Sequence, residues 1–100
     1  MSSSSEKRLE EIRKRISEID EQLITLIAER TGFAPEIASL KNSLGASVTD
    51  SKREQDICEQ TRILCEEHCI ECSVALKIIK ILMEYNKEVQ AEFFRKVDSK

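Results

Sequence analysis

Residues that turn or break a chain are scarce in this sequence of 100 amino acids, which has only two glycines and one proline. Strands joined by tight turns need such residues, so their scarcity argues against a β-sheet fold. Tryptophan is absent and aromatic residues make up only 4% of the chain, whereas charged residues make up 35%. That composition is typical of long amphipathic helices, and it predicts an all-α domain.

Targeting and membrane-spanning segments are also missing from the sequence. No apolar run is long enough to cross a membrane, and the N-terminal stretch MSSSSEKR lacks the apolar centre of a signal peptide. The net charge of −3 argues against general nucleic-acid binding, which requires a basic face. Without secretory targeting, the four cysteines are expected to be reduced thiols. We therefore expect a cytoplasmic protein that binds neither membranes nor nucleic acids.

Apolar residues recur at alternating spacings of three and four over about residues 7–42, as on the packed face of one long helix. They include Leu9, Ile12, Ile16, Ile19, Leu23, Leu26, Phe33, Ile37 and Leu40. At ~1.5 Å per residue such a helix is roughly 50 Å long, whereas a compact domain of this size has a radius of gyration of ~13 Å. Because the rest of the chain cannot cover this helix, we expect an intertwined homodimer.

The single proline, Pro35, falls inside this predicted helix. There it removes one hydrogen bond and clashes with the carbonyl of Thr31. We expect a helix that is bent locally but continuous, with Gly32 relieving the clash. Gly45 then ends the helix.

Two further helices follow in the expected organisation. The polar stretch 42–51 forms a linker, and either Asp50 or Ser51 caps a short second helix that ends near His68. A connection around residues 70–73 leads to a third helix of medium length. The chain is thus predicted to have a disordered tail at 1–6, one domain of a long, a short and a medium helix at 7–96, and a C-terminal tail at 97–100.

Polar side chains occupy positions that the apolar patterns would fill with hydrophobic residues. Arg30 falls in the seam of the first helix, where a guanidinium is unfavourable unless an anion pairs with it. A buried structural ion pair and a carboxylate-binding site both explain it. Asn86 and Gln90 interrupt the stripe of the last helix in the same way. Either an interhelical hydrogen bond or an oxygen-rich ligand would satisfy their amides.

Further charges lie at the flanks of the predicted helices. Arg13 and Lys41 are 28 residues apart, which is roughly 42 Å along one helix, so they cannot meet within one chain. They would approach each other if two copies paired antiparallel; otherwise both are solvated flanking charges. At the start of the second helix, capping accounts for Asp50 and Glu54 but leaves Arg53 as an additional cation.

The stretch from Cys65 through His68 and Cys69 to Cys72, with Cys58 one heptad earlier, resembles a set of metal ligands. Its spacing does not fit a two-knuckle zinc site, and three of the ligands would lie on one helix. Buried thiols behave as small apolar residues. We therefore predict no metal site.

Three segments carry a resemblance to a known family: LEEIRKRISEIDEQLITLIAER, then TDSKRE, then EYNKEVQ, with a lysine eleven residues after the final arginine of the first. In this order and at these separations they resemble the all-helical chorismate mutases, over about residues 7–94. Among these enzymes the chain looks like the free-standing, archaeal-type form. The resemblance implies the rearrangement of chorismate to prephenate in phenylalanine and tyrosine biosynthesis, without a cofactor.

The same resemblance implies roles for the polar residues of the first helix and their partners. Arg30 would bind one substrate carboxylate, and Arg13, supplied by the partner chain of the homodimer, would bind the other. Lys41 and Gln90 would donate hydrogen bonds to the ether oxygen of the bond that breaks.

The remaining roles belong to the second and third helices. Glu54 and the backbone near Asp50 would hold the ring hydroxyl, while Arg53 and Asn86 would complete the carboxylate and pocket contacts. Two alternatives remain open: an isochorismate pyruvate lyase of the same fold, and a non-catalytic helical dimerisation module, with or without zinc on the cysteines.

Overall fold

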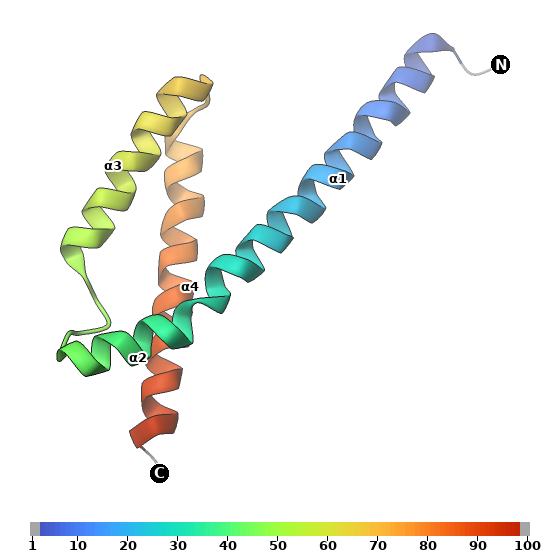
Figure 1. Cartoon of the computed structure of the whole chain (residues 1–100). Coiled ribbons are helices and arrows are strands. Elements are labelled where there is room, and N and C mark those ends of the chain that lie inside the picture. Colours follow the sequence, from blue (N-terminus) through green and yellow to red (C-terminus); the bar gives the residue numbers. More distant parts are fainter. Residues whose placement is uncertain (1–2, 99–100) are drawn as a thin grey trace. The chain divides into compact units, whose positions relative to one another are not determined.

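A computed structural model describes residues 3–98, which form α-helices without any strand. The prediction of an all-α fold is confirmed, and no helix in this part of the chain has the length and apolar character to cross a membrane. The chain divides into two compact units, one up to Arg30 and one from Thr31 onward. The helices are α1 (Ser4–Gly32), α2 (Ala34–Leu44), α3 (Ser51–His68) and α4 (Cys72–Asp98), labelled in Figure 1.

Helix α1 starts earlier than the sequence predicts. The Oγ of Ser3 accepts a hydrogen bond from the backbone N–H of Glu6 at 3.1 Å, and the Glu6 carboxylate accepts one from the N–H of Ser3 at 3.3 Å. This reciprocal capping box satisfies two free N–H groups and allows the helix to begin at Ser4. Residues 4–6 of the tail expected at 1–6 are therefore helical, and α4 likewise continues into the tail expected at 97–100. Residues 1–2 and 99–100 lie outside the described residues.

The prediction of one continuous helix across Pro35 is wrong, because α1 ends at Gly32 and α2 begins at Ala34. The intervening Phe33 keeps a near-helical backbone, with φ −81° and ψ −11°, and its carbonyl accepts a hydrogen bond from the N–H of Ile37 at 2.9 Å. Pro35 lies in the first turn of α2, where a missing N–H leaves no helical hydrogen bond unmade. Residues 3–98 therefore form four helices, with the predicted first helix divided between α1 and α2.

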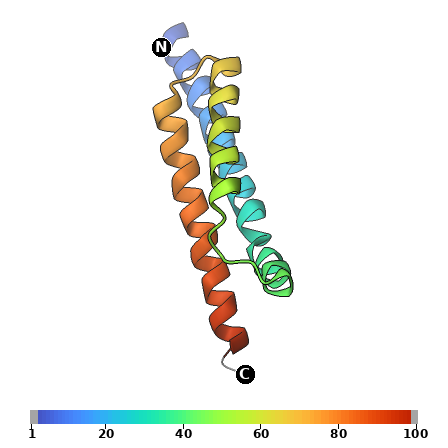
Figure 2. The ribbon, with the colours of Figure 1, turned by 90° about the vertical axis from the view of Figure 1, so that its left-hand side faces the viewer.

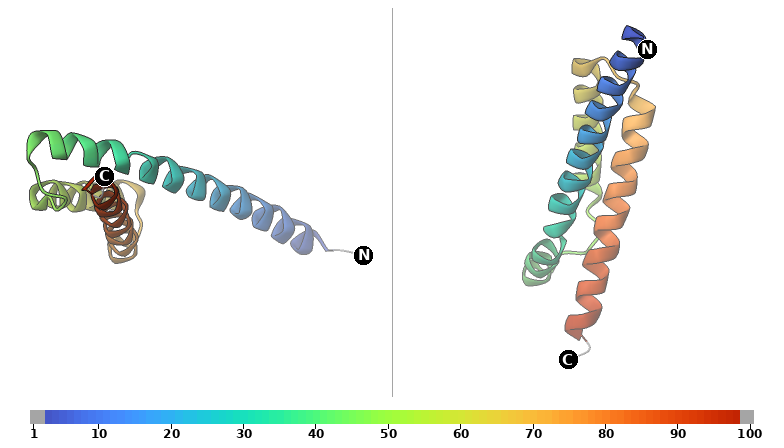
Figure 3. Two further views of the ribbon diagram at one scale, coloured as in Figure 1. Left: turned by 90° about the horizontal axis from the view of Figure 1, so that it is seen from below. Right: turned by 90° about the vertical axis from the view of Figure 1, so that its right-hand side faces the viewer.

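In the unit from Thr31 onward, α4 packs against both α2 and α3. Figure 2 shows α3 and α4 running side by side, and Figure 3 shows α2 crossing α4 closer to the C-terminus. The small side chains of Ala34 and Ala38, one turn apart on α2, are fully buried and permit a close approach to α4. Among the residues of this unit whose burial is described, the other buried ones are Thr61 and Cys65 of α3 and Met83 and Gln90 of α4.

The ends of α3 follow the predicted signals closely. Asp50 is the N-cap, and its carboxylate accepts a hydrogen bond from the backbone N–H of Arg53 at 3.0 Å. Ser51, the other predicted cap, is the first residue of the helix instead. The helix ends at His68, and Cys69 takes the left-handed conformation, with φ 54°, that turns the chain toward α4.

Gly45 ends α2 with a left-handed backbone, φ 67° and ψ 22°. In this conformation its N–H donates to the carbonyl of Asn42 at 3.2 Å, and the N–H of Ala46 donates to that of Lys41 at 2.8 Å. Only glycine adopts such a conformation without steric strain. Because this turn directs the chain back past Lys41, its geometry matters to the polar cluster described below.

Replacing Gly45 with alanine is expected to lower the free energy of unfolding by about 1 kcal/mol, from backbone strain alone. Apart from Gly45 itself and its two chain neighbours, no atom of the described residues lies within 4 Å of the place where the new Cβ would stand. Chemical denaturation of the purified variant measures the effect. The matched control is Gly32→Ala, which is equally unobstructed and is not among the positive-φ positions. Equal losses in both variants would show that the left-handed turn is not the cause.

Candidate functional site

Lys41 lies in the last turn of α2, where its part-buried ammonium group has two acceptors. It donates to the backbone carbonyl of Val48 at 2.7 Å and to Oε1 of Gln90 at 3.0 Å. The first acceptor is present because the chain folds back after α2, and the second because α2 packs on α4. The structure thus brings together two of the predicted site residues, 49 positions apart in sequence.

Gln90 is buried, with only 4% of its surface exposed. Lysine has donors and no acceptor, so the carbonyl oxygen of the Gln90 amide must face Lys41. Its amide nitrogen then points the other way and donates to Oδ1 of Asn86, one turn earlier on α4. Because an amide nitrogen carries two hydrogens, one can serve Asn86 and the other a ligand oxygen. The interhelical hydrogen bond that would satisfy these amides is present between Lys41 and Gln90. It leaves one hydrogen of the Gln90 amide nitrogen for a ligand.

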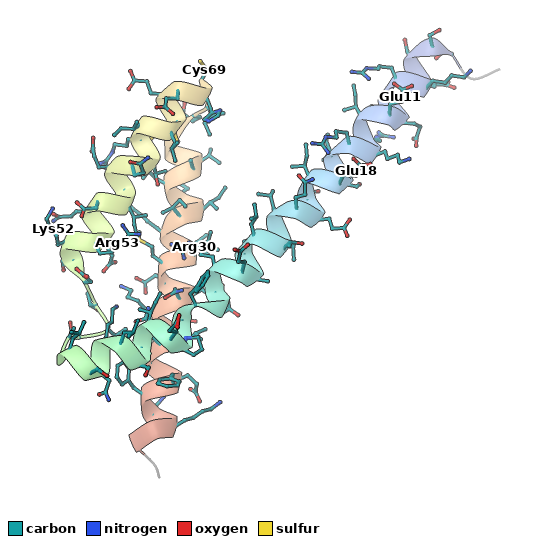
Figure 4. The ribbon with its side chains drawn as sticks, viewed as in Figure 1. Glu11, Glu18, Arg30, Lys52, Arg53 and Cys69 are labelled. Atoms are coloured by element: carbon teal, nitrogen blue, oxygen red, sulfur yellow. The ribbon has the colours of Figure 1, made fainter. Side chains whose placement is uncertain are left out.

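The start of α3 carries the predicted residues Asp50, Arg53 and Glu54. Asp50 is occupied with capping, and Arg53 lies exposed on the first turn, as Figure 4 shows. Glu54 plays no part in a cap: its carboxylate accepts a hydrogen bond at 3.3 Å from Nζ of Lys87 on α4. Sequence reasoning missed Lys87, because a lysine in a helix rich in Glu and Lys is usually a solvated charge.

Lys87 is a cation held between two carboxylates. Its ammonium lies 2.8 Å from the Glu84 carboxylate and 3.3 Å from that of Glu54. The hydrogen bond with Glu84, followed by the one with Glu54, raises the pKa of Lys87 above its usual 10.5 against an opposing effect of burial. Lys87 is therefore protonated at neutral pH.

One face of α4 collects these contacts. Asn86, Lys87 and Gln90 lie within one turn of each other on that helix, and residues three and four apart share a face. Gln90 meets Lys41 of α2, while Lys87 meets Glu54 of α3. The end of α2 and the start of α3 are thus attached to neighbouring positions of α4, around a cluster with cationic, amide and carboxylate groups.

A separate open groove of about 770 Å³ lies along α3 and α4. Four carboxylates and two cations line it, so its net charge would repel an anionic ligand. Its lining includes Glu54 from the cluster above, and otherwise consists of Gln55, Asp56, Cys58, Glu59, Arg62, Lys80, Met83 and Glu84. The groove does not suit the dianionic substrate that the resemblance implies.

Arg13 and Arg30 both lie on α1, in the other compact unit. Arg13 is exposed and pairs with Glu10 at 3.7 Å, while Arg30 is part buried in the last turn of the helix, labelled in Figure 4. The two residues are 17 positions apart, which corresponds to roughly 26 Å along a helix. They cannot contact one small ligand from the same chain.

Within the part of the chain that the structure describes, no group of three histidine, cysteine, aspartate or glutamate side chains is placed to hold a metal ion. All four thiols are free, and Cys65 is buried. Burial, followed by a hydrogen bond with Cys72, raises the pKa of the Cys65 thiol. A protonated, buried thiol is unreactive and acts as a small apolar side chain.

Residues 12–91 of the chain match the chorismate mutase type II family. The chain belongs to this family. It is 41% identical over 93 residues to the chorismate mutase of Methanocaldococcus jannaschii, covering 93% of this chain and 94% of that relative. It is 31% identical to the bifunctional chorismate mutase/prephenate dehydratase of Escherichia coli K12, over 81% of this chain and 21% of that longer protein.

A solved structure of the family has the same fold. The NMR structure of a monomeric chorismate mutase from Methanococcus jannaschii superposes with a TM-score of 0.71 at 35% identity, covering 94% of this chain and 98% of the other. The interpretation of the sequence as a chorismate mutase, an isomerase, is confirmed by this family membership and by the close relative.

Proposed function

We propose that this chorismate mutase converts chorismate to prephenate in a pocket built around Lys41 and Gln90. The observation that carries the proposal is the orientation of these two side chains: the Lys41 ammonium is anchored by Gln90 and a backbone carbonyl, and it in turn orients the Gln90 amide. Donors that are already oriented stabilise developing charge without reorganising during the reaction.

The chemistry of the Claisen rearrangement fits such a cluster. The carbon–oxygen ether bond breaks as a new carbon–carbon bond forms within the same molecule, and no proton is transferred. No general base or nucleophile is needed. Negative charge that grows on the ether oxygen would be stabilised by the Lys41 cation and by the free amide hydrogen of Gln90.

The carboxylates of the substrate require cations of their own. Arg30 and Arg53 would bind one end of the substrate, and Arg13 of a second chain would bind the other, because the planar guanidinium matches a carboxylate. Binding both ends folds the enolpyruvyl side chain over the ring and selects the near-attack geometry. Asn86 would complete the pocket.

The ring hydroxyl would be held by Glu54 and by the backbone at Asp50. Both residues are at the start of α3, and Glu54 is attached to the face of α4 that carries Gln90. A carboxylate accepts a hydrogen bond from a hydroxyl more strongly than a neutral group does. These two residues would therefore recognise the polar edge of the ring.

We also propose that the enzyme is a homodimer. The unit up to Arg30 consists of α1 and has no second element to cover the apolar seam of this helix, none of whose residues is buried. Its side chains are between 40% and 59% exposed at Leu9, Ile12, Ile16, Ile19, Leu23 and Leu26. A continuous apolar face of this kind is typical of an interface. A second copy would cover the seam and supply Arg13, which cannot share one ligand with Arg30 of its own chain.

We place the reaction in the cytoplasm, at the step that forms prephenate for phenylalanine and tyrosine biosynthesis. Four free thiols suit a reducing compartment. The relative from Escherichia coli, which joins a chorismate mutase to a prephenate dehydratase, supports this place in the sequence of reactions.

Chorismate turnover tests the proposal directly. We expect purified protein to remove the diene absorbance of chorismate, with prephenate identified as phenylpyruvate after acid treatment. Arg30→Ala is expected to lower kcat/KM at least about a hundredfold, because a charge-assisted carboxylate contact is lost. A folded protein that leaves chorismate intact but releases pyruvate from isochorismate would favour the lyase instead.

A further inference from the structure

The contact between Lys87 and Glu54 differs from the ion pairs along the surfaces of single helices. Arg8–Glu11 and Lys52–Asp56 are examples of the latter, with side chains at least half exposed. Lys87 instead joins α4 to α3, and its side chain is 23% exposed while that of Glu54 is 29% exposed. An ion pair that is largely withdrawn from water holds its geometry better than an exposed one.

We infer that Lys87 is a positioning residue for Glu54 in the chorismate mutase reaction. The inference rests on the proposed function, in which Glu54 accepts a hydrogen bond from the ring hydroxyl. Lys87 engages Oε1 of Glu54, which leaves Oε2 to face a ligand. A carboxylate anchored at one oxygen presents the other in a defined direction, without first losing rotational freedom.

The charge of Glu54 also affects how the substrate would bind. Chorismate carries two carboxylates, and an isolated Glu54 carboxylate in the same pocket would repel them. The ammonium of Lys87 is shared with Glu84 and offsets part of the Glu54 charge, so that this carboxylate can act as an acceptor while repelling the dianion less. Glu84, which is 65% exposed and lies 2.8 Å from Lys87, holds the ammonium in place from the solvent side.

The position of Lys87 on α4 places it beside the other residues of the cluster. It follows Asn86 directly and precedes Gln90 by three residues, so it belongs to the face of α4 that carries the cluster. Lys87 would act on the substrate only through Glu54, and its loss would therefore weaken substrate binding. We expect the loss of Lys87 to raise KM far more than it lowers kcat.

The experiment measures kcat and KM for chorismate in Lys87→Met, Lys87→Arg and Lys77→Met. Lys87→Met is expected to lower kcat/KM about tenfold, mainly through KM, since one charge-assisted hydrogen bond no longer orients Glu54. Lys87→Arg keeps the charge and should recover most of the loss. Lys77→Met removes an exposed lysine from the same helix and should match the wild type.

A double-mutant cycle separates positioning from a merely structural role. In the Glu54→Gln background, Lys87→Met is expected to add no further loss in kcat/KM, because its target is already changed. Additive losses, or a lower melting temperature with an unchanged KM, would overturn the inference. If Lys87→Met does not fold, Lys87→Gln takes its place in the same cycle. Wild-type protein that does not turn over chorismate would reject the proposed function itself, and the role of Lys87 with it.

Discussion

Replacing Lys41 with methionine is expected to lower kcat about a thousandfold, at the upper end of the effect of removing one preorganised donor. Two losses combine in this variant. First, the cation that would face the ether oxygen is removed. Second, Oε1 of Gln90 loses the hydrogen bond from Lys41 at 3.0 Å, which orients the Gln90 amide with its oxygen toward α2. The effect should fall on kcat, because charge on the ether oxygen develops only in the transition state.

Methionine is the suitable replacement because it fills the same part-buried position with an apolar chain of similar length. Circular dichroism should show an unchanged helical content, so that the kinetic loss cannot be attributed to unfolding. Lys77→Met again serves as the control for removing one positive charge. A Lys41→Met enzyme with more than about a tenth of the wild-type kcat would place the stabilising charge elsewhere.

Only some residues of the candidate site break an apolar pattern in the sequence. Gln90 does, whereas Lys41 is a charge that flanks the seam of the first helix, and the structure joins the two across α2 and α4. Their hydrogen bond itself is not predictable, since nothing in either segment specifies the packing of α2 on α4. Lys87 and Glu54 illustrate the same limit: 33 positions separate them, and only the tertiary fold brings the two charges together.

Pro35 shows why the helix break was missed. Proline is unfavourable inside a helix but favourable in its first turn, so its effect depends on where the helix starts. The apolar spacing continues through Phe33 and Ile37 and indicates no new start. The structure makes the proline compatible by ending α1 at Gly32 and starting α2 two residues later, with Phe33 still near-helical. The spacing of apolar residues in the sequence does not indicate so small a change in the backbone.

Mixing two inactive variants is expected to restore activity if the enzyme is a homodimer with shared sites. Arg13→Ala and Arg30→Ala should each be nearly inactive alone, because every site lacks one carboxylate ligand. In a mixed dimer, the intact Arg30 of one chain faces the intact Arg13 of the other, and the second site carries both defects. With about half of the dimers mixed, specific activity should recover to about a quarter of the wild-type value.

The control for this experiment uses two residues that the proposal assigns to the same chain. Mixing Arg30→Ala with Lys41→Met leaves one defect in each site of every dimer, so no activity should return. In each mixture, the two variants are unfolded and refolded together so that they exchange subunits. Sedimentation then checks that dimers form. Monomers in sedimentation would refute the assembly. Recovery confined to the first mixture would place the apolar seam of α1, from Leu9 to Leu26, against the second copy, which carries Arg13 into the site.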